Sequence, residues 1–90
     1  MKLCIIGLGR MGVGISHRLL TTNHTVIGYD PSNISQKAGS DIGVTIVNTL
    51  EEAAKSASIF WLMLPAGEVI DATLEKLQPL VAPESILMDG

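Results

Sequence analysis

Short apolar runs alternate with amphipathic stretches along this 90-residue chain, and this alternation limits the folds that it can adopt. The apolar runs have the length of strands and lack polar residues on either face, which is typical of central strands in a parallel sheet. Predicted strands span residues 3–6, 25–29, 44–47, 59–64 and 85–89. Amphipathic segments between consecutive strands indicate β-α-β units, so the sequence predicts an α/β protein with a parallel sheet.

Local signals set the ends of the predicted helices, which span residues 11–20, 32–38 and 49–56, with a fourth that ends at Pro79. Asn23 follows the first helix and is suited to a left-handed cap. Ser32 can cap a short second helix, which Gly39 should end. Thr49 and Glu52 match a capping box, in which each side chain accepts from the other residue's amide. The first helix is expected to turn Met11, Ile15 and Leu19 to one side.

The composition of the chain limits the kinds of molecule that it can bind. The chain is 47% hydrophobic, with a mean hydropathy of +0.39 and a net charge of −3, and its charges are scattered. Nucleic acid is excluded because neutralising phosphates needs a basic patch. No run approaches the roughly 20 apolar residues of a membrane span, and the apolar start is too short for a signal peptide, so we expect a cytoplasmic protein. So much apolar character in a small domain suggests that part of its surface meets other protein.

The most specific motif follows the first strand. Gly7-Leu8-Gly9-Arg10-Met11-Gly12 fits G-x-G-x-x-G between a strand and a helix. The first glycine permits a tight turn, the second lets backbone approach a pyrophosphate, and the third lets the helix pack closely on the sheet. Phosphates would face the amides at the start of the helix, near Arg10 and Met11. These residues predict a dinucleotide site on a Rossmann-type, doubly wound sheet of about five strands in the order 3-2-1-4-5.

An acidic residue lies at the position where a dinucleotide site needs one. Asp30 ends the second strand, 18 residues after Gly12, close to the roughly 20 at which a carboxylate meets the adenosine ribose. It would accept hydrogen bonds from the ribose hydroxyls and repel a 2′-phosphate, which favours NAD over NADP. Arg10 and Ser32 could both reach a 2′-phosphate, so NADP remains an alternative.

The other polar residues do not indicate a catalytic or metal-binding site. His17 and Arg18 are expected in solvent, His24 lacks a partner at metal-ligand spacing, and Trp61 is expected in the core. Cys4 lies in an apolar run, where a buried, inert thiol is expected. The 90 residues contain no nucleophile–base pair, carboxylate pair or metal cluster, so we predict a binding site without catalytic residues.

Several collinear segments resemble decarboxylating 6-phosphogluconate dehydrogenase, within the β-hydroxyacid dehydrogenases. They are the glycine motif with Ile5-Ile6 before it, Tyr29-Asp30, residues 61–69 (WLMLPAGEV) and Asp89-Gly90. The similarity covers the whole chain but only the cofactor domain of that family, and it is strongest to the short form that tends to use NAD. The family's catalytic Lys and Glu and its helical substrate domain have no counterpart in residues 1–90.

The resemblance implies roles for individual positions. Residues 7–12 would hold the pyrophosphate, Asp30-Pro31-Ser32 would face the adenosine ribose, and Leu64-Pro65-Ala66 would line the nicotinamide side. NADP-using members carry Asn-Arg-Thr where this chain has Asp-Pro-Ser, which strengthens the prediction of NAD. The family oxidises 6-phosphogluconate and releases CO2 to give ribulose 5-phosphate in the pentose phosphate pathway. As one domain spanning residues 1–90, the chain would place only the cofactor and would be inactive alone.

Two other functions remain open. A β-hydroxyacid dehydrogenase of the 3-hydroxyisobutyrate type shares the glycine loop, but it usually reads D-x-S-T where this chain has Asp89-Gly90. The chain could also be a non-catalytic module that senses NAD. We expect a dimer for the full-length protein, and Ile86, Leu87 and Met88 on an exposed edge strand would favour pairing or dimerisation of an isolated fragment.

Overall fold

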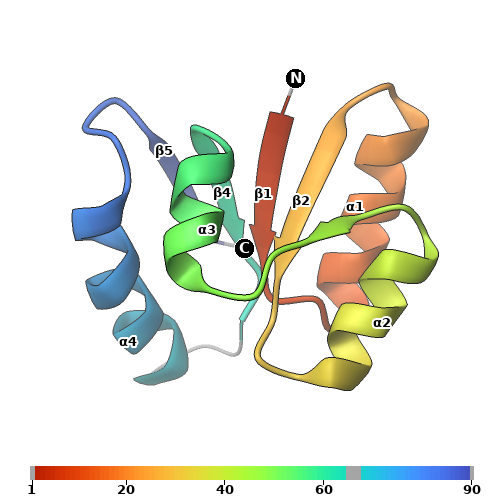
Figure 1. The fold of residues 1–90 in the computed structure, drawn as a ribbon, viewed down its shortest axis with the longest axis horizontal. Coiled ribbons are helices and arrows are strands. Elements are labelled where there is room, and N and C mark those ends of the chain that lie inside the picture. Colours follow the sequence, from red (N-terminus) through yellow and green to blue (C-terminus); the bar gives the residue numbers. More distant parts are fainter. Residues whose placement is uncertain (1, 65–67, 90) are drawn as a thin grey trace.

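A computed structural model describes residues 2–64 and 68–89 and shows a single parallel sheet covered by helices on both faces (Figure 1). The strand order is β3-β2-β1-β4-β5, as predicted. The strands are β1 (Lys2–Ile6), β2 (Thr25–Tyr29), β3 (Thr45–Ile46), β4 (Ile59–Leu62) and β5 (Ile86–Asp89). The helices are α1 (Arg10–Thr21), α2 (Asn33–Asp41), α3 (Leu50–Ser56), α4 (Glu68–Leu77) and a short 3-10 helix, Gln78–Leu80.

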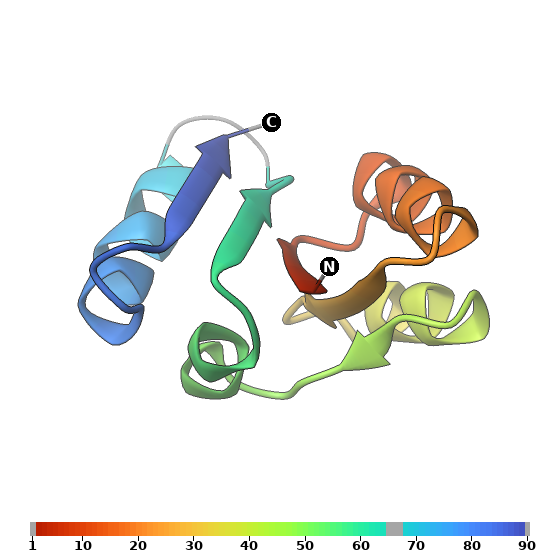
Figure 2. The same cartoon turned by 90° about the horizontal axis from the view of Figure 1, so that it is seen from above.

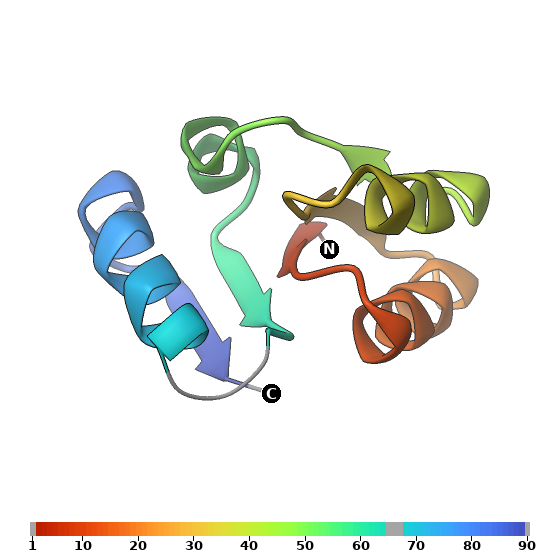
Figure 3. The same ribbon diagram turned by 90° about the horizontal axis from the view of Figure 1, so that it is seen from below.

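After β3, the chain reverses the direction in which it crosses the sheet. From β1 the chain moves outward through β2 to β3, and α3 then carries it back to β4, on the other side of β1. As a result, α1 and α2 cover one face and α3 and α4 cover the other, which Figures 2 and 3 show from opposite ends. The carboxyl ends of β1 and β4 therefore lie side by side where the helices diverge, the place at which such sheets bind ligands.

Two hydrophobic clusters form the core, one on each face of the sheet. Alternate residues of β1 supply both, since Cys4 and Ile6 pack with Phe60 toward α3 and α4, whereas Ile5 packs with Val26 toward α1 and α2. This arrangement explains why the strands read as uniformly apolar. It also confirms that β1 is a central strand. Trp61 packs, partly buried, against the second cluster.

Helix ends follow the predicted signals with two differences. Asn23 has a φ of 67°, the left-handed conformation expected after α1. The Thr49 hydroxyl accepts from the Glu52 amide at 3.1 Å, but Glu52 Oε1 accepts from the Asn48 amide, one residue before the position predicted by a capping box. Helix α2 continues to Asp41 rather than ending before Gly39, because Gly39 is buried and its missing Cβ leaves room for the Leu8 side chain.

The buried side of α1 differs from the prediction. Its fully buried residues are Gly12 and Ser16, while Ile15 and Leu19 are partly buried and Met11 is 67% exposed. The helix approaches the sheet through its small residues, and this close packing turns Met11 outward, so its assignment to the packed side was wrong. His17 and Arg18 are exposed, as expected.

Strands β3 and β4 are shorter than predicted. Strand β4 ends at Leu62 rather than Leu64, and β3 keeps only two residues. Strand β5 forms an edge, with Ile86 54% exposed and Leu87 and Met88 partly buried. Within residues 2–64 and 68–89, every helix is too short or too polar to cross a lipid bilayer.

Two glycines of α1 provide a matched test of the close helix–sheet contact. A Cβ on Gly12 would lie 2.0 Å from the Gly7 carbonyl oxygen, whereas a Cβ on Gly14 would meet nothing within 4 Å. We expect Gly12→Ala to lower the free energy of unfolding by about 1–3 kcal/mol or more through overpacking. Gly14→Ala should raise it by roughly 0.5–1 kcal/mol, because alanine is the better helix former. Urea unfolding measures both, and equal effects would contradict the packing.

The buried thiol gives a prediction for alkaline pH. Cys4 is fully buried, and burial raises its pKa from 9.0 to about 11, partly offset by a hydrogen bond with Ser56. Above pH 9 the unfolded chain releases the thiol proton while the folded chain keeps it, so this group should lower stability as pH rises from about 9 to 11. A Cys4→Ala variant should lack this part of the decline. A thiol reagent that labelled the native protein rapidly at pH 8 would contradict the burial.

Candidate functional site

The glycine motif forms the connection from β1 to α1 at the carboxyl ends of the strands (Figure 1). Gly7 has a φ of +101°, and its amide donates to the Tyr29 carbonyl at 2.8 Å. A Cβ there would lie 2.7 Å from the Met63 carbonyl oxygen, so glycine is required by both conformation and space. Gly7 and Gly12 thus belong to the fold, holding the turn and the helix against the sheet.

Gly9 has a different environment. It is exposed, its φ of −70° suits any residue, and a Cβ on it would meet nothing within 4 Å. Gly9 is also the N-cap of α1, and it provides no side chain to satisfy the first amides of the helix. The first intrahelical bond, from the Val13 amide to the Gly9 carbonyl, leaves the amides of the first turn available. An open, uncapped helix N-terminus of this kind attracts anions.

Leu8 is a core residue as well as a loop residue. Its side chain is 1% exposed and lies in the cluster between the sheet and helices α1 and α2. It fills the space that Gly28 and Gly39 leave by lacking a Cβ. Only the backbone of Leu8 can therefore face a ligand. The following residues, Arg10 and Met11, are exposed at the start of α1.

Asp30 connects the glycine loop to the end of β2. Its Oδ2 accepts from the Leu8 amide at 2.7 Å, and its Oδ1 accepts from the Ser32 amide at 2.8 Å. The residue is only 9% exposed, and its carbonyl oxygen accepts from the Gln36 side chain at 2.6 Å. The sequence did not reveal the contact with Leu8, because it joins residues 22 positions apart. Each carboxylate oxygen keeps a second lone pair with which it can accept from a ligand.

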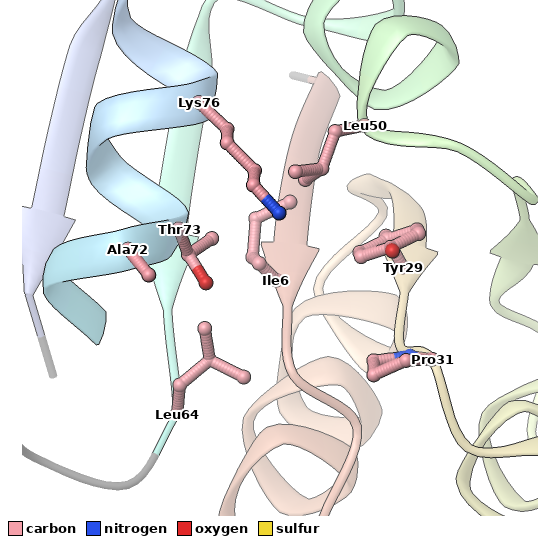
Figure 4. Close-up of a pocket in the computed structure, with 8 residues that line it drawn as sticks. All are labelled: Ile6, Tyr29, Pro31, Leu50, Leu64, Ala72, Thr73 and Lys76. Atoms are coloured by element: carbon pink, nitrogen blue, oxygen red, sulfur yellow. The ribbon is translucent and has the colours of Figure 1, made fainter. Parts of the chain in front are cut away.

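A pocket of about 250 Å³ opens beside this connection, on the face covered by α3 and α4 (Figure 4). The strand ends contribute Ile6, Tyr29, Pro31 and Leu64. The two helices contribute Leu50, Ala72, Thr73 and Lys76. Its lining is mainly apolar with a few polar groups, which is typical of a small-molecule site.

The predicted site residues thus come together at one end of the sheet. Gly9, Arg10 and Met11 lie at the start of α1, Asp30 and Ser32 at the end of β2, and Pro31 and Leu64 share the pocket. Pro65 and Ala66 lie outside the described residues. The pocket also brings in Tyr29 and Lys76, which sequence reasoning did not include. In the described part of the chain, no group of three His, Cys, Asp or Glu residues could hold a metal ion.

Comparisons with known proteins agree with this geometry. The sequence profile of the NAD binding domain of 6-phosphogluconate dehydrogenase matches residues 2–90. The chain is 35% identical to the NAD(+)-dependent decarboxylating 6-phosphogluconate dehydrogenase of Haloferax volcanii, over the whole chain and 31% of that relative. It is 30% identical to the decarboxylating enzyme of Staphylococcus aureus, over 96% of this chain and 20% of the relative.

Solved structures extend the similarity to a neighbouring group. A structure of Mycobacterium tuberculosis 3-hydroxyisobutyrate dehydrogenase with L-serine superposes with a TM-score of 0.93 at 28% identity. That match covers 98% of this chain and 30% of the other. The chain thus spans about 30% of the length of the Haloferax volcanii and Mycobacterium tuberculosis dehydrogenases and 20% of the Staphylococcus aureus enzyme. Because the profile covers residues 2–90, the chain belongs to the family of NAD binding domains of 6-phosphogluconate dehydrogenase.

Proposed function

We propose that this chain is the cofactor domain of an NAD-dependent 6-phosphogluconate dehydrogenase. The observation that carries the proposal is the contrast between the glycines of the motif. Gly7 and Gly12 are enclosed by backbone, whereas Gly9 faces open space at an uncapped helix N-terminus. Gly14 is equally open but lies within α1, whereas Gly9 lies at the free amides of the helix N-terminus. At that place the lack of a side chain is best explained by close approach of a pyrophosphate.

Each part of the site has a role in this proposal. The backbone of residues 7–12 holds the pyrophosphate, with the amides near Arg10 and Met11 facing its oxygens. Asp30, Pro31 and Ser32 face the adenosine ribose. Leu64, Pro65 and Ala66 line the nicotinamide side. When bound, the dinucleotide supplies a hydride acceptor, and the chain's own residues hold and orient it.

The charge at the end of β2 supports NAD as the preferred dinucleotide. Asp30 presents a buried carboxylate whose oxygens already accept two amides, and it lies next to the expected ribose position. A 2′-phosphate brought to this place would meet like charge in a poorly solvated environment. The Haloferax volcanii relative is an NAD(+)-dependent enzyme, which agrees with this preference.

The whole protein would oxidise 6-phosphogluconate and release CO2, giving ribulose 5-phosphate in the pentose phosphate pathway. In this scheme residues 1–90 form one cofactor domain, and the substrate-binding and catalytic residues belong to a separate helical domain. We further propose a cytoplasmic dimer. The exposed apolar side chains of Ile34 and Ile86 support contacts with further protein.

A second candidate is a β-hydroxyacid dehydrogenase of the 3-hydroxyisobutyrate type. The TM-score of 0.93 to the Mycobacterium tuberculosis enzyme supports it. The two candidates differ in chemistry, because oxidation of 6-phosphogluconate is followed by loss of CO2. The complete protein, supplied with NAD, should therefore release CO2 and form NADH with 6-phosphogluconate. NADH formation with 3-hydroxyisobutyrate alone would instead assign the second function.

The pyrophosphate assignment is tested at Gly9. We expect Gly9→Ala to keep the fold, since the added Cβ meets no protein atom, but to weaken NAD binding at least tenfold by obstructing the phosphates. Isothermal titration measures the dissociation constant, and Gly14→Ala on the same helix is the matched control. Equal NAD affinity in both variants would overturn the assignment. A folded wild-type protein that bound no NAD would overturn the proposed function.

Asp30 tests the preference for NAD. Asp30→Asn keeps the size of the side chain and one acceptor oxygen but removes the charge. We expect the ratio of NADP to NAD dissociation constants to fall by about tenfold, because repulsion of the 2′-phosphate is lost. Asp41→Asn, at an exposed position paired with Lys37, should leave the ratio unchanged. An unchanged ratio in Asp30→Asn would show that this carboxylate holds the loop without selecting the cofactor.

A further inference from the structure

The pocket beside the glycine loop is lined by a lysine, Lys76. Among the described residues that line this pocket, Lys76 is the one that carries a charge. It lies in the last turn of α4, and its ammonium group points into the pocket toward Ile6 and Leu50 (Figure 4). The other side of the pocket is formed by Tyr29 and Pro31, which flank Asp30.

No ion pair along the helix explains the orientation of Lys76 among the described residues. On a helix, a lysine can form an ion pair with a carboxylate three or four residues away. For Lys76 these positions hold Thr73, Ala72, Pro79 and Leu80, none of which is acidic. Lys37 on α2 forms such an ion pair, because its ammonium group lies 3.5 Å from Asp41, four residues later. Within residues 2–64 and 68–89, Lys76 has no such ion pair.

The location of the pocket limits what can occupy it. Pro31 follows Asp30 directly, so a ribose held at Asp30 would present its attached base to the pocket. On the side nearer Asp30 the walls supply apolar surface from Ile6 and Leu50, which suits the faces of a flat aromatic ring. An ammonium group supplies donors only and needs acceptors at the edge of that ring.

We propose that Lys76 recognises the adenine base of the dinucleotide, donating a hydrogen bond to ring nitrogen N1 on the edge opposite the ribose. This inference rests on the proposed function and adds to it a residue that selects the base. Tyr29 also lines the pocket, and its hydroxyl can accept from the neighbouring amino group of adenine. Lys76 is exposed, so water satisfies its ammonium group in the free protein. A base that lacks an acceptor at this edge displaces that water without replacing its hydrogen bond, which lowers the affinity for that base.

The test uses Lys76→Met in the complete protein, because methionine keeps much of the apolar stem without the charge. Isothermal titration compares NAD with nicotinamide mononucleotide, which has no adenine, and with the 1,N6-etheno analogue of NAD, whose N1 is tied into an extra ring. We expect Lys76→Met to weaken NAD binding about tenfold and to leave the mononucleotide unchanged. The preference of the wild type for NAD over the etheno analogue should shrink severalfold in the variant.

Two matched variants separate base recognition from a general effect of charge. Lys37→Met removes a lysine that is paired with Asp41 and does not line this pocket, and this variant should bind NAD as the wild type does. Lys76→Arg keeps the donors and should retain part of the preference for adenine. Lys76 also lies where a cation stabilises a helix end, and losing that effect would change the melting temperature without changing the preference for adenine.

The outcomes separate this inference from the proposed function. If Lys76→Met binds NAD as tightly as the wild type, or loses affinity equally for NAD and the mononucleotide, Lys76 does not recognise the base. If the wild type binds NAD and Gly9→Ala does not, while Lys76→Met has no effect, the proposed function stands and only the inference fails. If the wild type binds none of these ligands, both fail.

Discussion

The hydrogen bond between the Leu8 amide and the Asp30 carboxylate, 2.7 Å long and buried, holds the binding end of this domain together. It joins the loop after β1 to the end of β2, while the Leu8 side chain anchors the same loop in the core. The second oxygen of Asp30 positions Ser32, the N-cap of α2. One carboxylate thus sets the positions of two helix N-termini relative to the sheet. Because the bond is buried and charged at one partner, it belongs to the stronger class of protein hydrogen bonds.

In the proposed function, this connection gives Asp30 two roles. Its carboxylate holds the loop through the Leu8 amide. Its remaining lone pairs would accept from the ribose hydroxyls, and its charge would oppose a 2′-phosphate. The glycines of the motif also have different roles. Gly7 and Gly12 permit close contacts within the protein, whereas the open space at Gly9 leaves room for the proposed ligand. A single motif therefore serves both folding and binding.

Much of the architecture could be predicted, because the signals that specify it are local. The length and apolar character of the strands, the order of elements and the cap at Thr49 each depend on a few neighbouring residues. The predictions that failed depended on packing between elements. Met11 was expected on the packed side of α1, but small residues bring the helix so close to the sheet that Gly12 and Ser16 occupy that side. Helix α2 passes through Gly39 because a distant residue, Leu8, fills the space beside it.

The sequence by itself determined the parallel sheet, the dinucleotide motif and the acid that follows β2, since periodicity and spacing along the chain encode all three. Only the tertiary structure decided how those parts meet. It turned Leu8 inward, engaged both oxygens of Asp30, and brought Lys76 from α4 to the pocket that Tyr29 and Pro31 line. The physical reason is that burial and hydrogen bonding between distant segments depend on their relative positions in space, and these arise only when the whole sheet and its helices have packed.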